Sequence, residues 1–176
     1  MLIRKALLND IDAINDIYSL IHDEEENNIV SIGWNRNIYP RKETALKALE
    51  RDDLFVMTDN DKIVASAIIN QIQVPEYFDA KWNHNASEEE VMVLHTLTVN
   101  PKLSRKGYGK TFVEYYEDYA RKHKCPYLRM DTNAINVRAR AMYKKLGYTE
   151  ADIVPCVFNG IPNVQLVCLE KKIDID

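Results

Sequence analysis

Hydrophobic residues recur along the chain at two different spacings, which separate predicted helices from predicted strands. From Ile11 to Ile21 apolar side chains return every three or four positions, and the same spacing runs from Phe112 to Ala120. This spacing places apolar side chains on one face of a helix. Asn9 precedes the first segment and is a residue type that caps helix N-termini. Helices are therefore expected from Asn9 into the acidic run 23–26, and over residues 43–51, 107–123 and 136–146.

Short apolar segments bounded by turn residues predict the strands. Residues 54–57 and 63–72 flank a polar turn and predict a β-hairpin, and residues 154–158 and 164–170 flank Asn159–Gly160 in the same way. Further strands are expected over residues 2–6, 91–99 and 127–131. This order of strands and helices is typical of an α/β fold. We therefore expect a mixed central sheet of about seven strands with about four helices on its two faces.

Composition and charge restrict the class of protein. The 176 residues include 46% hydrophobic and 28% charged side chains, close to the globular average, which excludes disorder, collagen and coiled coil as descriptions of the whole chain. Because Pro and Gly are scarce, with 6 and 5 residues, and no Ser/Gly-rich linker is present, we expect one domain over residues 1–176. The net charge of −4 argues against nucleic acid or an anionic membrane as the main partner.

No segment of the sequence predicts export or membrane insertion. The longest apolar run, Ile63–Ile69, is far shorter than the roughly 18 residues of a membrane helix. The N-terminus also lacks the apolar region of a secretory signal. Cys125, Cys156 and Cys168 are odd in number and show no CxxC spacing, so reduced and mostly buried thiols are expected. We therefore expect a cytoplasmic protein.

A basic loop with two glycines follows the predicted strand 91–99. Gly107 and Gly109 leave no side chain between the backbone amides and a ligand, and the loop opens a helix whose free N–H groups attract anions. Lysine or arginine stands at positions 102, 105, 106 and 110, with no acid among them. This combination favours a diphosphate ligand. A GxG turn alone often only caps a helix, and the spacing here is neither GxGxxG nor GxxxxGK[ST], which disfavours dinucleotide and P-loop sites.

Asn136, Ala139 and Tyr143 form the second informative pattern. At about 100° per residue these three lie along one face of the predicted helix 136–146, so a small residue separates two hydrogen-bonding groups. Such a face suits a shallow groove for a ligand. The alternative is an ordinary amphipathic helix with Tyr143 as a half-buried anchor, and it is favoured where this segment is considered alone.

The two patterns together resemble the GCN5-related N-acetyltransferase (GNAT) superfamily. The acetyl-CoA loop of the family, Gln/Arg-x-x-Gly-x-Gly/Ala after a Val-x-Pro, is matched by Val99-Asn-Pro101 and by residues 104–109, with Ser104 in the Gln/Arg position. The later signature of the family is matched by Asn136, Ala139, Tyr143, Lys145, Gly147 and Tyr148. The element order matches over almost the whole chain. The resemblance therefore implies the GNAT fold and an enzyme that uses acetyl-CoA and no metal.

The resemblance also implies how acetyl-CoA is held. In the family the cosubstrate lies where the fourth and fifth strands splay apart, with its pantetheine arm along the fourth strand and its pyrophosphate on the glycine loop. Arg105 is expected to replace part of the phosphate contact that Ser104 lacks. The implied acetyl-CoA-binding residues are Leu97, Val99, Ser104, Arg105, Lys106, Gly107, Tyr108, Gly109, Lys110 and Asn136.

Catalysis in the family implies direct transfer to a neutral amine, with Tyr143 as the acid that protonates the departing thiolate. A base is also needed, because a lysine-like amine is almost wholly protonated at pH 7. The candidates are Glu90 and His95, which stands in an expected alternating row from Val91 to Val99 facing one side of the sheet. The alternatives are a structural histidine and a solvated acidic run over Glu88–Glu90.

The acceptor site of the family usually comes from the first two helices and from the loop between the third and fourth strands. Here those segments supply four aromatic residues, Trp34, Tyr39, Tyr77 and Trp82, and the acids of the run 23–26. An aromatic and acidic mouth suits a cationic amine. Each aromatic residue alone also fits ordinary packing under a loop.

These observations predict an N-acetyltransferase that passes an acetyl group from acetyl-CoA directly to a primary amine of a small molecule or peptide. A non-catalytic acyl-CoA-binding module of the same fold is the alternative, and a nucleotide-binding domain outside the family is a third interpretation. The late strand pair is a candidate contact for a homodimer. The sequence identifies neither the acceptor amine nor the base.

Overall fold

Seven strands form one mixed sheet in the order β1-β2-β3-β4-β5-β7-β6. The computed structural model describes residues 1–103 and 106–175. The strands are β1 (Leu2–Lys5), β2 (Leu54–Asp59), β3 (Lys62–Asn70), β4 (Val91–Val99), β5 (Tyr127–Asn133), β6 (Thr149–Phe158) and β7 (Ile161–Lys172). The helices are α1 (Ile11–Glu26), α2 (Lys42–Glu50), α3 (Tyr108–Lys122) and α4 (Val137–Lys145). The expected mixed sheet with helices on both faces is confirmed.

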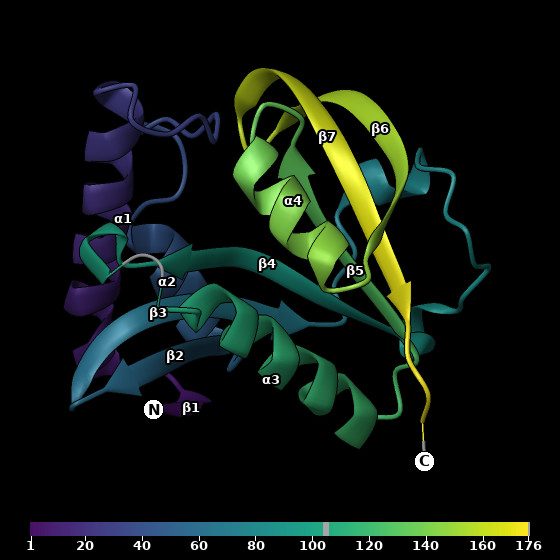
Figure 1. The fold of residues 1–176 in the computed structure, drawn as a ribbon, viewed down its shortest axis with the longest axis horizontal. Helices are drawn as coiled ribbons and strands as arrows, with labels where there is room; N and C mark the ends of the chain where they lie inside the picture. The colour runs from purple at the N-terminus through teal and green to yellow at the C-terminus, as the bar shows by residue number, and fades with distance from the viewer. Residues whose placement is uncertain (104–105, 176) are drawn as a thin grey trace.

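The alternation of side chains along β2 shows that helices cover both faces of the sheet. Leu54 and Val56 pack into the cluster beneath α1 and α2, whereas Phe55 and Met57 pack into the cluster beneath α3. All four side chains are buried, because successive residues of a strand point to opposite faces and both faces are covered. Figure 1 shows α3 and α4 in front of the sheet and α1 at its left edge.

A third apolar cluster lies under the segment between β3 and β4. This segment contains the short 3₁₀ turns η2 (Pro75–Phe78) and η3 (Glu88–Glu90). Tyr77 of η2 packs on Val91 and Val93 of β4 and on residues of β6 and β7. The long connection is therefore anchored to the sheet rather than detached from it.

The start of α1 differs from the sequence prediction. A 3₁₀ turn, η1 (Leu8–Asp10), precedes the helix, and Asp10 rather than Asn9 occupies the N-cap position without a capping side-chain bond. The Asp10 carboxylate instead accepts hydrogen bonds from the Leu7 amide at 2.7 Å and from Arg4 at 2.6 Å. Because this carboxylate serves the preceding turn, the expectation that Asn9 caps α1 is wrong.

A β-bulge in β4 changes which side chains share a face. Ser66 pairs with Thr98 and Ile68 pairs with His95, so β4 has one more residue than β3 in this interval, and Thr96 adopts a φ of 50°. After the bulge, Leu97 and Val99 pack toward the α3 cluster, whereas Val91 and Val93 belong to the cluster under η2. The predicted single row from Val91 to Val99 is therefore wrong, because the bulge reverses the alternation after His95.

The parallel ladder between β4 and β5 ends in the middle of the sheet. Four residue pairs form it, from Val91 with Tyr127 to Leu94 with Met130. Beyond Leu94 the two strands diverge, as Figure 1 shows, and β5 continues its pairing with β7 alone. A further 3₁₀ turn, η4 (Pro101–Leu103), follows β4. The divergence leaves one edge of β4 open next to the start of α3.

Candidate active site

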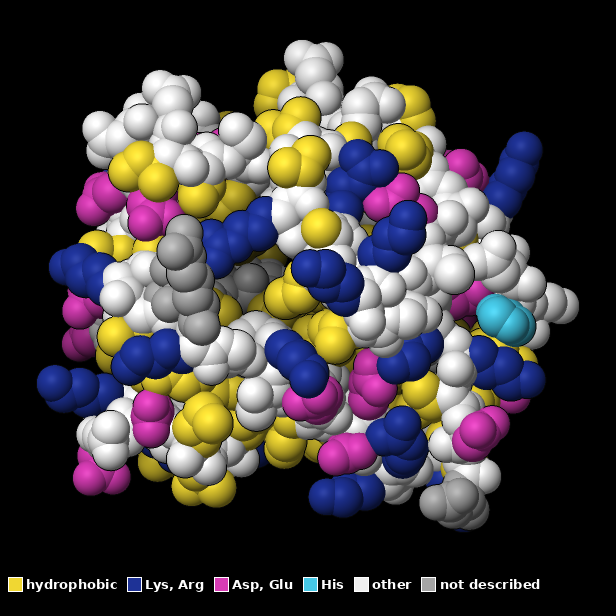
Figure 2. All heavy atoms as spheres, viewed as in Figure 1, with side chains coloured by type: hydrophobic (Ala, Val, Ile, Leu, Met, Phe, Trp, Pro, Cys, Tyr) yellow, Lys and Arg dark blue, Asp and Glu magenta, His cyan; other side chains and the backbone are white. Residues whose placement is uncertain are grey.

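A cavity of about 870 Å³ opens where β4 and β5 separate. One part, the glycine-loop half, is lined by residues 97–101, 103 and 106–110 and by one face of α4. The other part, the aromatic half, is lined by residues 29–34, by Tyr39 and by the turn between β6 and β7. Figure 2 shows the hollow with Lys and Arg side chains gathered around its rim. A single deep cavity assembled from several segments is the usual setting for a small-molecule site.

The start of α3 provides free backbone amides in the glycine-loop half. Gly107 has a φ of 79° and precedes the helix, and the first intrahelical bond runs from the Thr111 amide to the Gly107 carbonyl at 3.0 Å. The amides of residues 108–110 have no intrahelical acceptor, as is normal for the first turn of a helix. A side chain added at Gly109 would lie 3.3 Å from the Met142 sulfur, so glycine keeps α3 close to α4. These donors fit the oxygen atoms of a diphosphate.

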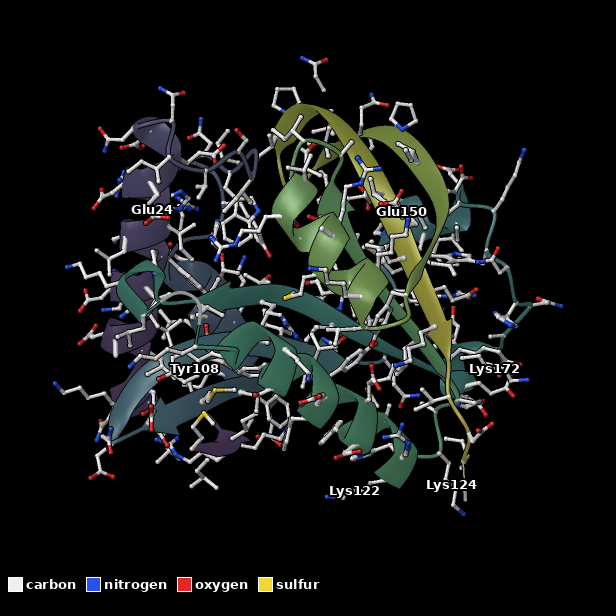
Figure 3. All side chains as sticks on the ribbon, viewed as in Figure 1. Glu24, Tyr108, Lys122, Lys124, Glu150 and Lys172 are labelled. Carbon is white, nitrogen blue, oxygen red and sulfur yellow. The ribbon has the colours of Figure 1, made fainter. Side chains whose placement is uncertain are left out.

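Basic side chains surround this helix start. Lys106 and Lys110 line the cavity together with Arg138 of α4. Lys110 also lies 3.5 Å from Glu114 one turn along α3. Tyr108 donates a hydrogen bond of 2.6 Å to Asp59, which fixes its ring at the base of the loop (Figure 3). The expected contacts of Ser104 and Arg105 fall outside the described residues.

The open edge of β4 and the N-terminus of α4 complete the glycine-loop half. Leu97 and Val99 both line the cavity, beyond the point where β4 loses β5 as a partner. An extended ligand with amide groups can bond to such an unpaired strand edge, as the pantetheine arm requires. Asn136 also lines the cavity, but its side-chain oxygen accepts the Ala139 amide at 3.2 Å. Asn136 therefore caps α4, a role that the sequence analysis did not include.

Tyr143 reaches the cavity from the buried face of α4. The residue is only 7% exposed, and among the described residues its hydroxyl has no hydrogen-bond partner. Burial, and next the nearby Asp131, raise the pKa of this phenol well above its usual value. The ring packs edge-on against Tyr148 with 6.0 Å between centroids. Tyr143 thus presents a protonated hydroxyl to the cavity at neutral pH.

The two candidate bases lie in different places. His95 lines the cavity, and its Nε2 lies 3.0 Å from the Asn70 side-chain oxygen on β3. Burial lowers the pKa of His95 to about 4, so the imidazole is neutral at pH 7. Glu90 does not line the cavity: it is exposed in η3, at the N-terminal end of β4, and accepts bonds of 3.0 Å from the Ser87 amide and hydroxyl. These bonds lower the pKa of Glu90.

The predicted aromatic residues also divide into two groups. Trp34 and Tyr39 line the cavity and pack edge to face at 6.1 Å, and the Tyr39 hydroxyl bonds to that of Thr96. Tyr77 of η2 is buried and does not line the cavity. Trp82 packs against it, with 5.0 Å between the ring centroids. The structure therefore does not bring Tyr77 to the cavity surface, because its ring fills the core beneath the β3–β4 connection.

The acidic run at the end of α1 is mostly occupied by local contacts. Arg36 pairs with Asp23 at 2.6 Å and with Glu26 at 2.8 Å. Glu25 accepts the amides of Ile32 and Gly33 and so shapes the loop after α1. Glu24 is the member of the run that lines the cavity (Figure 3).

Sequence reasoning missed two contributors to the cavity. Asp131 lines it from β5, and partial removal of its carboxyl group from water raises the pKa of Asp131 to about 7. The turn between β6 and β7 adds Phe158 and Ile161 to the wall. The end of β5 carried a weak signal for Asp131, because a carboxylate follows an apolar strand there. Nothing in the sequence marked the β6–β7 turn as part of a site.

Comparison with known proteins supplies the family. The model described as the Acetyltransferase (GNAT) family matches residues 14–148, most of the chain. The chain belongs to this family. An uncharacterized N-acetyltransferase of Methanocaldococcus jannaschii is 23% identical over 158 residues, which cover 86% of this chain and 62% of that relative. The chain thus spans less than two thirds of the relative's length.

Solved structures of acetyltransferases share the architecture. A GNAT-family acetyltransferase of Streptococcus agalactiae has a TM-score of 0.82 at 21% identity, with 98% of this chain and 95% of that chain covered. The protein yncA of Salmonella typhimurium, solved with its cofactor acetyl-CoA, has a TM-score of 0.69 at 18% identity, with 100% and 95% covered. At these identities the likeness shows the fold, and it confirms the GNAT fold expected from the sequence.

Within residues 1–103 and 106–175, no helix is both long enough and apolar enough to cross a membrane. The same residues contain no group of three or more His, Cys, Asp or Glu side chains arranged to hold a metal ion.

Proposed function

We propose that this GNAT-family chain is an N-acetyltransferase that transfers an acetyl group from acetyl-CoA directly to a primary amine of a small molecule or peptide. One observation carries the proposal: the unpaired edge of β4, the free amides of residues 108–110 and the buried Tyr143 hydroxyl all border the same cavity. An elongated, anionic thioester fits this combination. The acetyl-CoA in the structurally similar Salmonella protein supports the choice of cosubstrate.

Each part of the glycine-loop half has a task in this proposal. The amides of residues 108–110 hold the pyrophosphate, with Lys106 and Lys110 balancing its charge. The backbone at Leu97 and Val99 bonds the pantetheine arm and thereby directs the thioester toward the point where β4 and β5 separate. Holding the two reactants in line removes much of the entropy cost of their encounter.

Tyr143 serves as the acid in this proposal. Its hydroxyl donates a proton to the sulfur as the carbon–sulfur bond breaks. The environment keeps the phenol protonated until charge develops on the sulfur, because burial raises its pKa. Among the described residues none of the three cysteines lines the cavity, which favours direct transfer over an acyl-cysteine.

A non-catalytic acyl-CoA-binding module remains the alternative. Ser104 motivates it, because the family places Gln or Arg at that position of the loop. Such a module would bind CoA and acetyl-CoA without consuming either.

Two measurements on the purified chain separate these functions. Isothermal titration with acetyl-CoA tests binding, and thiol release is then followed with polyamines, amino acids, aminoglycosides and peptide N-termini. Binding together with amine-dependent thiol release supports the enzyme. Binding without release for any amine supports the module, and tighter binding of ATP than of CoA contradicts both.

A further inference from the structure

Asp131 occupies the first position of β5 beyond its ladder with β4. The last pair of that ladder is Leu94 with Met130, so continuation of the register would place His95 beside Asp131. Leu128 and Met130 point into the cluster under α3, and Asp131, like Arg129, therefore points to the opposite face of β5. The apex between the diverging strands thus carries a carboxyl group that lines the cavity.

One oxygen atom of Asp131 is fixed and the other is available. The buried Tyr77 hydroxyl donates a hydrogen bond of 2.7 Å to Oδ2. Among the described residues Oδ1 has no hydrogen-bond partner, and no cation pairs with this carboxyl group. A carboxylate that has lost part of its hydration and has no cation beside it is destabilised in its charged form.

We propose that Asp131 receives the ammonium group of an acceptor amine with an apolar body and removes its proton before acetyl transfer. The proposal rests on the acetyltransferase function and specifies its base and its acceptor class. Tyr77 is a positioning residue in it, because its phenol orients the carboxyl group and does not line the cavity. The sequence allowed Tyr77 either as an acceptor-site residue or as packing under a loop, and in this proposal the buried Tyr77 has a function.

His95 is less suited to this task in both position and basicity. Its Nε2 donates to the Asn70 oxygen, which also accepts the Ile72 amide at 2.9 Å, so the ring is held toward β3. An alkylamine has a pKa of about 10.4, so proton transfer to a group of pKa about 4 is unfavourable by about six powers of ten. Transfer to Asp131, with a pKa of about 7, is unfavourable by only about three.

Asp131 titrates near neutral pH, whereas the phenols and thiols around it do not. Its surroundings raise the pKa values of the nearby phenols and thiols, which therefore stay protonated. The ionisable groups that face it are Tyr39, Tyr77, Tyr143, Cys156, Cys168 and Glu76. The Glu76 carboxylate adds to the raised pKa of Asp131, though less than burial does.

The wall of the aromatic half indicates the body of the acceptor. Val30, Ile32, Trp34, Phe158 and Ile161 all line the cavity. Apolar surface of this kind gains free energy when it covers a hydrocarbon or aromatic group. A primary amine on a short apolar arm therefore places its nitrogen at Asp131 and its body against these apolar side chains.

The proton transfers balance in the following way. The ammonium gives one proton to Oδ1 of Asp131, and its lone pair forms the carbon–nitrogen bond at the thioester carbonyl. The carbon–sulfur bond breaks with its electron pair on sulfur, and Tyr143 donates its hydroxyl proton to that sulfur. A second nitrogen proton returns to the Tyr143 oxygen, the third stays on the amide, and Asp131 releases its proton to solvent.

The test uses phenethylamine and acetyl-CoA with the full chain, and kcat/KM is measured from pH 5.5 to 9.5. For the native protein we expect kcat/KM to rise with a midpoint near pH 7 and to reach a plateau above it, because the Asp131 carboxyl group must be ionised to accept the proton. Asp131→Asn keeps the shape of the side chain and an acceptor for Tyr77. It should lower kcat/KM at least 100-fold at pH 6.5 and abolish the plateau, so that the rate rises with the fraction of neutral amine up to pH 9.5. Asp131→Glu should restore a plateau.

Controls separate the role of Asp131 from folding and from the proposed function. The Kd for acetyl-CoA should change less than threefold in Asp131→Asn, and Tyr77→Phe should move the plateau without removing it. A plateau that survives Asp131→Asn, or that disappears instead in His95→Gln, would overturn the proposal. Acetylation of spermidine but not of phenethylamine would overturn the acceptor class and leave the acetyltransferase function standing. Absence of turnover with every amine would reject that function and this proposal with it.

Discussion

The two halves of the cavity are built from different kinds of structure. The glycine-loop half comes from two compact stretches of chain and offers mainly backbone groups, the edge of β4 and the first amides of α3. The aromatic half gathers side chains from the loop after α1, the end of β5 and the β6–β7 turn. Short sequence motifs determine local backbone geometry, whereas the tertiary fold determines which distant side chains form a common surface. The first half therefore follows from the motifs that the chain has in common with the family pattern, and the second follows from how distant segments of this chain pack together.

Removal of the Tyr143 hydroxyl should have the largest effect, because this hydroxyl is the proposed acid for the departing thiolate. Tyr143→Phe is expected to lower kcat by at least about 100-fold, the usual contribution of a positioned acid, with the Kd for acetyl-CoA changed less than twofold. Steady-state kinetics and isothermal titration measure the two quantities.

Tyr148→Phe is the matched control for Tyr143→Phe. Its ring packs on Tyr143, and its hydroxyl donates to Glu117 at 3.2 Å, away from the cavity. This variant should lose roughly 1 kcal/mol of unfolding free energy and keep its kcat. Equal kcat values for the two variants would remove Tyr143 from its proposed role.

Crowding at Gly109 should damage the glycine-loop half alone. A Cβ there lies 3.3 Å from the Met142 sulfur and 3.8 Å from Val99, so a valine side chain would press on α4 or occupy the loop. Gly109→Val is expected to weaken acetyl-CoA binding at least about tenfold, which corresponds to about 1.4 kcal/mol. Isothermal titration measures the change.

Gly147→Ala is the corresponding control for Gly109→Val. Gly147 has a φ of 87° after α4, and a side chain there meets only the Lys171 side chain at 3.7 Å. Strain in the left-handed region should lower the melting temperature while leaving the Kd for acetyl-CoA unchanged. An unaltered Kd in Gly109→Val as well would show that the cosubstrate does not occupy this loop.

Truncation of Trp34 should affect the aromatic half alone. Trp34→Ala removes a large apolar surface from the wall, so we expect KM for the acceptor amine to rise about fivefold to tenfold. The Kd for acetyl-CoA should stay constant. Phe78→Ala removes an aromatic side chain that is 73% exposed outside the cavity and should change neither value. A weaker Kd for acetyl-CoA in Trp34→Ala would contradict the division into two halves.

Loss of one charge at the rim should have the smallest effect. Lys110→Ala is expected to weaken acetyl-CoA binding about threefold at low salt and less at high salt, because the side chain is exposed and screened. Lys122→Ala, at the other end of α3, is the matched control and should leave binding unchanged. Titrations at two ionic strengths provide the comparison, and equal effects of the two variants would rule out a local role for Lys110.

The contrast between local motifs and tertiary packing also explains which features could be predicted from the sequence. The helix periodicities, the hairpins, the glycine loop and the Asn136–Tyr143 pattern depend on neighbours along the chain. The structure places Gly107, Gly109 and Tyr143 around one cavity, as the two motifs imply. The bulge at Thr96 could not be predicted, because it depends on the pairing of β4 with β3. That bulge reversed the expected alternation after His95.

Asp131 and Tyr77 show the same limit in the site itself. Asp131 looks in the sequence like the polar end of a strand, and its place at the apex follows from where the β4–β5 ladder stops. From the sequence, Tyr77 fits either an acceptor site or packing under a loop, and the structure shows it buried and bonded to Asp131. The hydrogen bond between them joins residues 54 positions apart in the chain, so no local sequence pattern predicts it.

The most direct test of direct transfer between the two halves is a product balance. The protein is incubated with acetyl-CoA and phenethylamine, and free thiol, N-acetylated amine and acetylated protein are quantified together by mass spectrometry. We predict equal amounts of thiol and N-acetylated amine and no acetylated protein at any time. Thiol release without acetylated amine, or acetyl groups held on the protein before the amine is added, would contradict direct transfer.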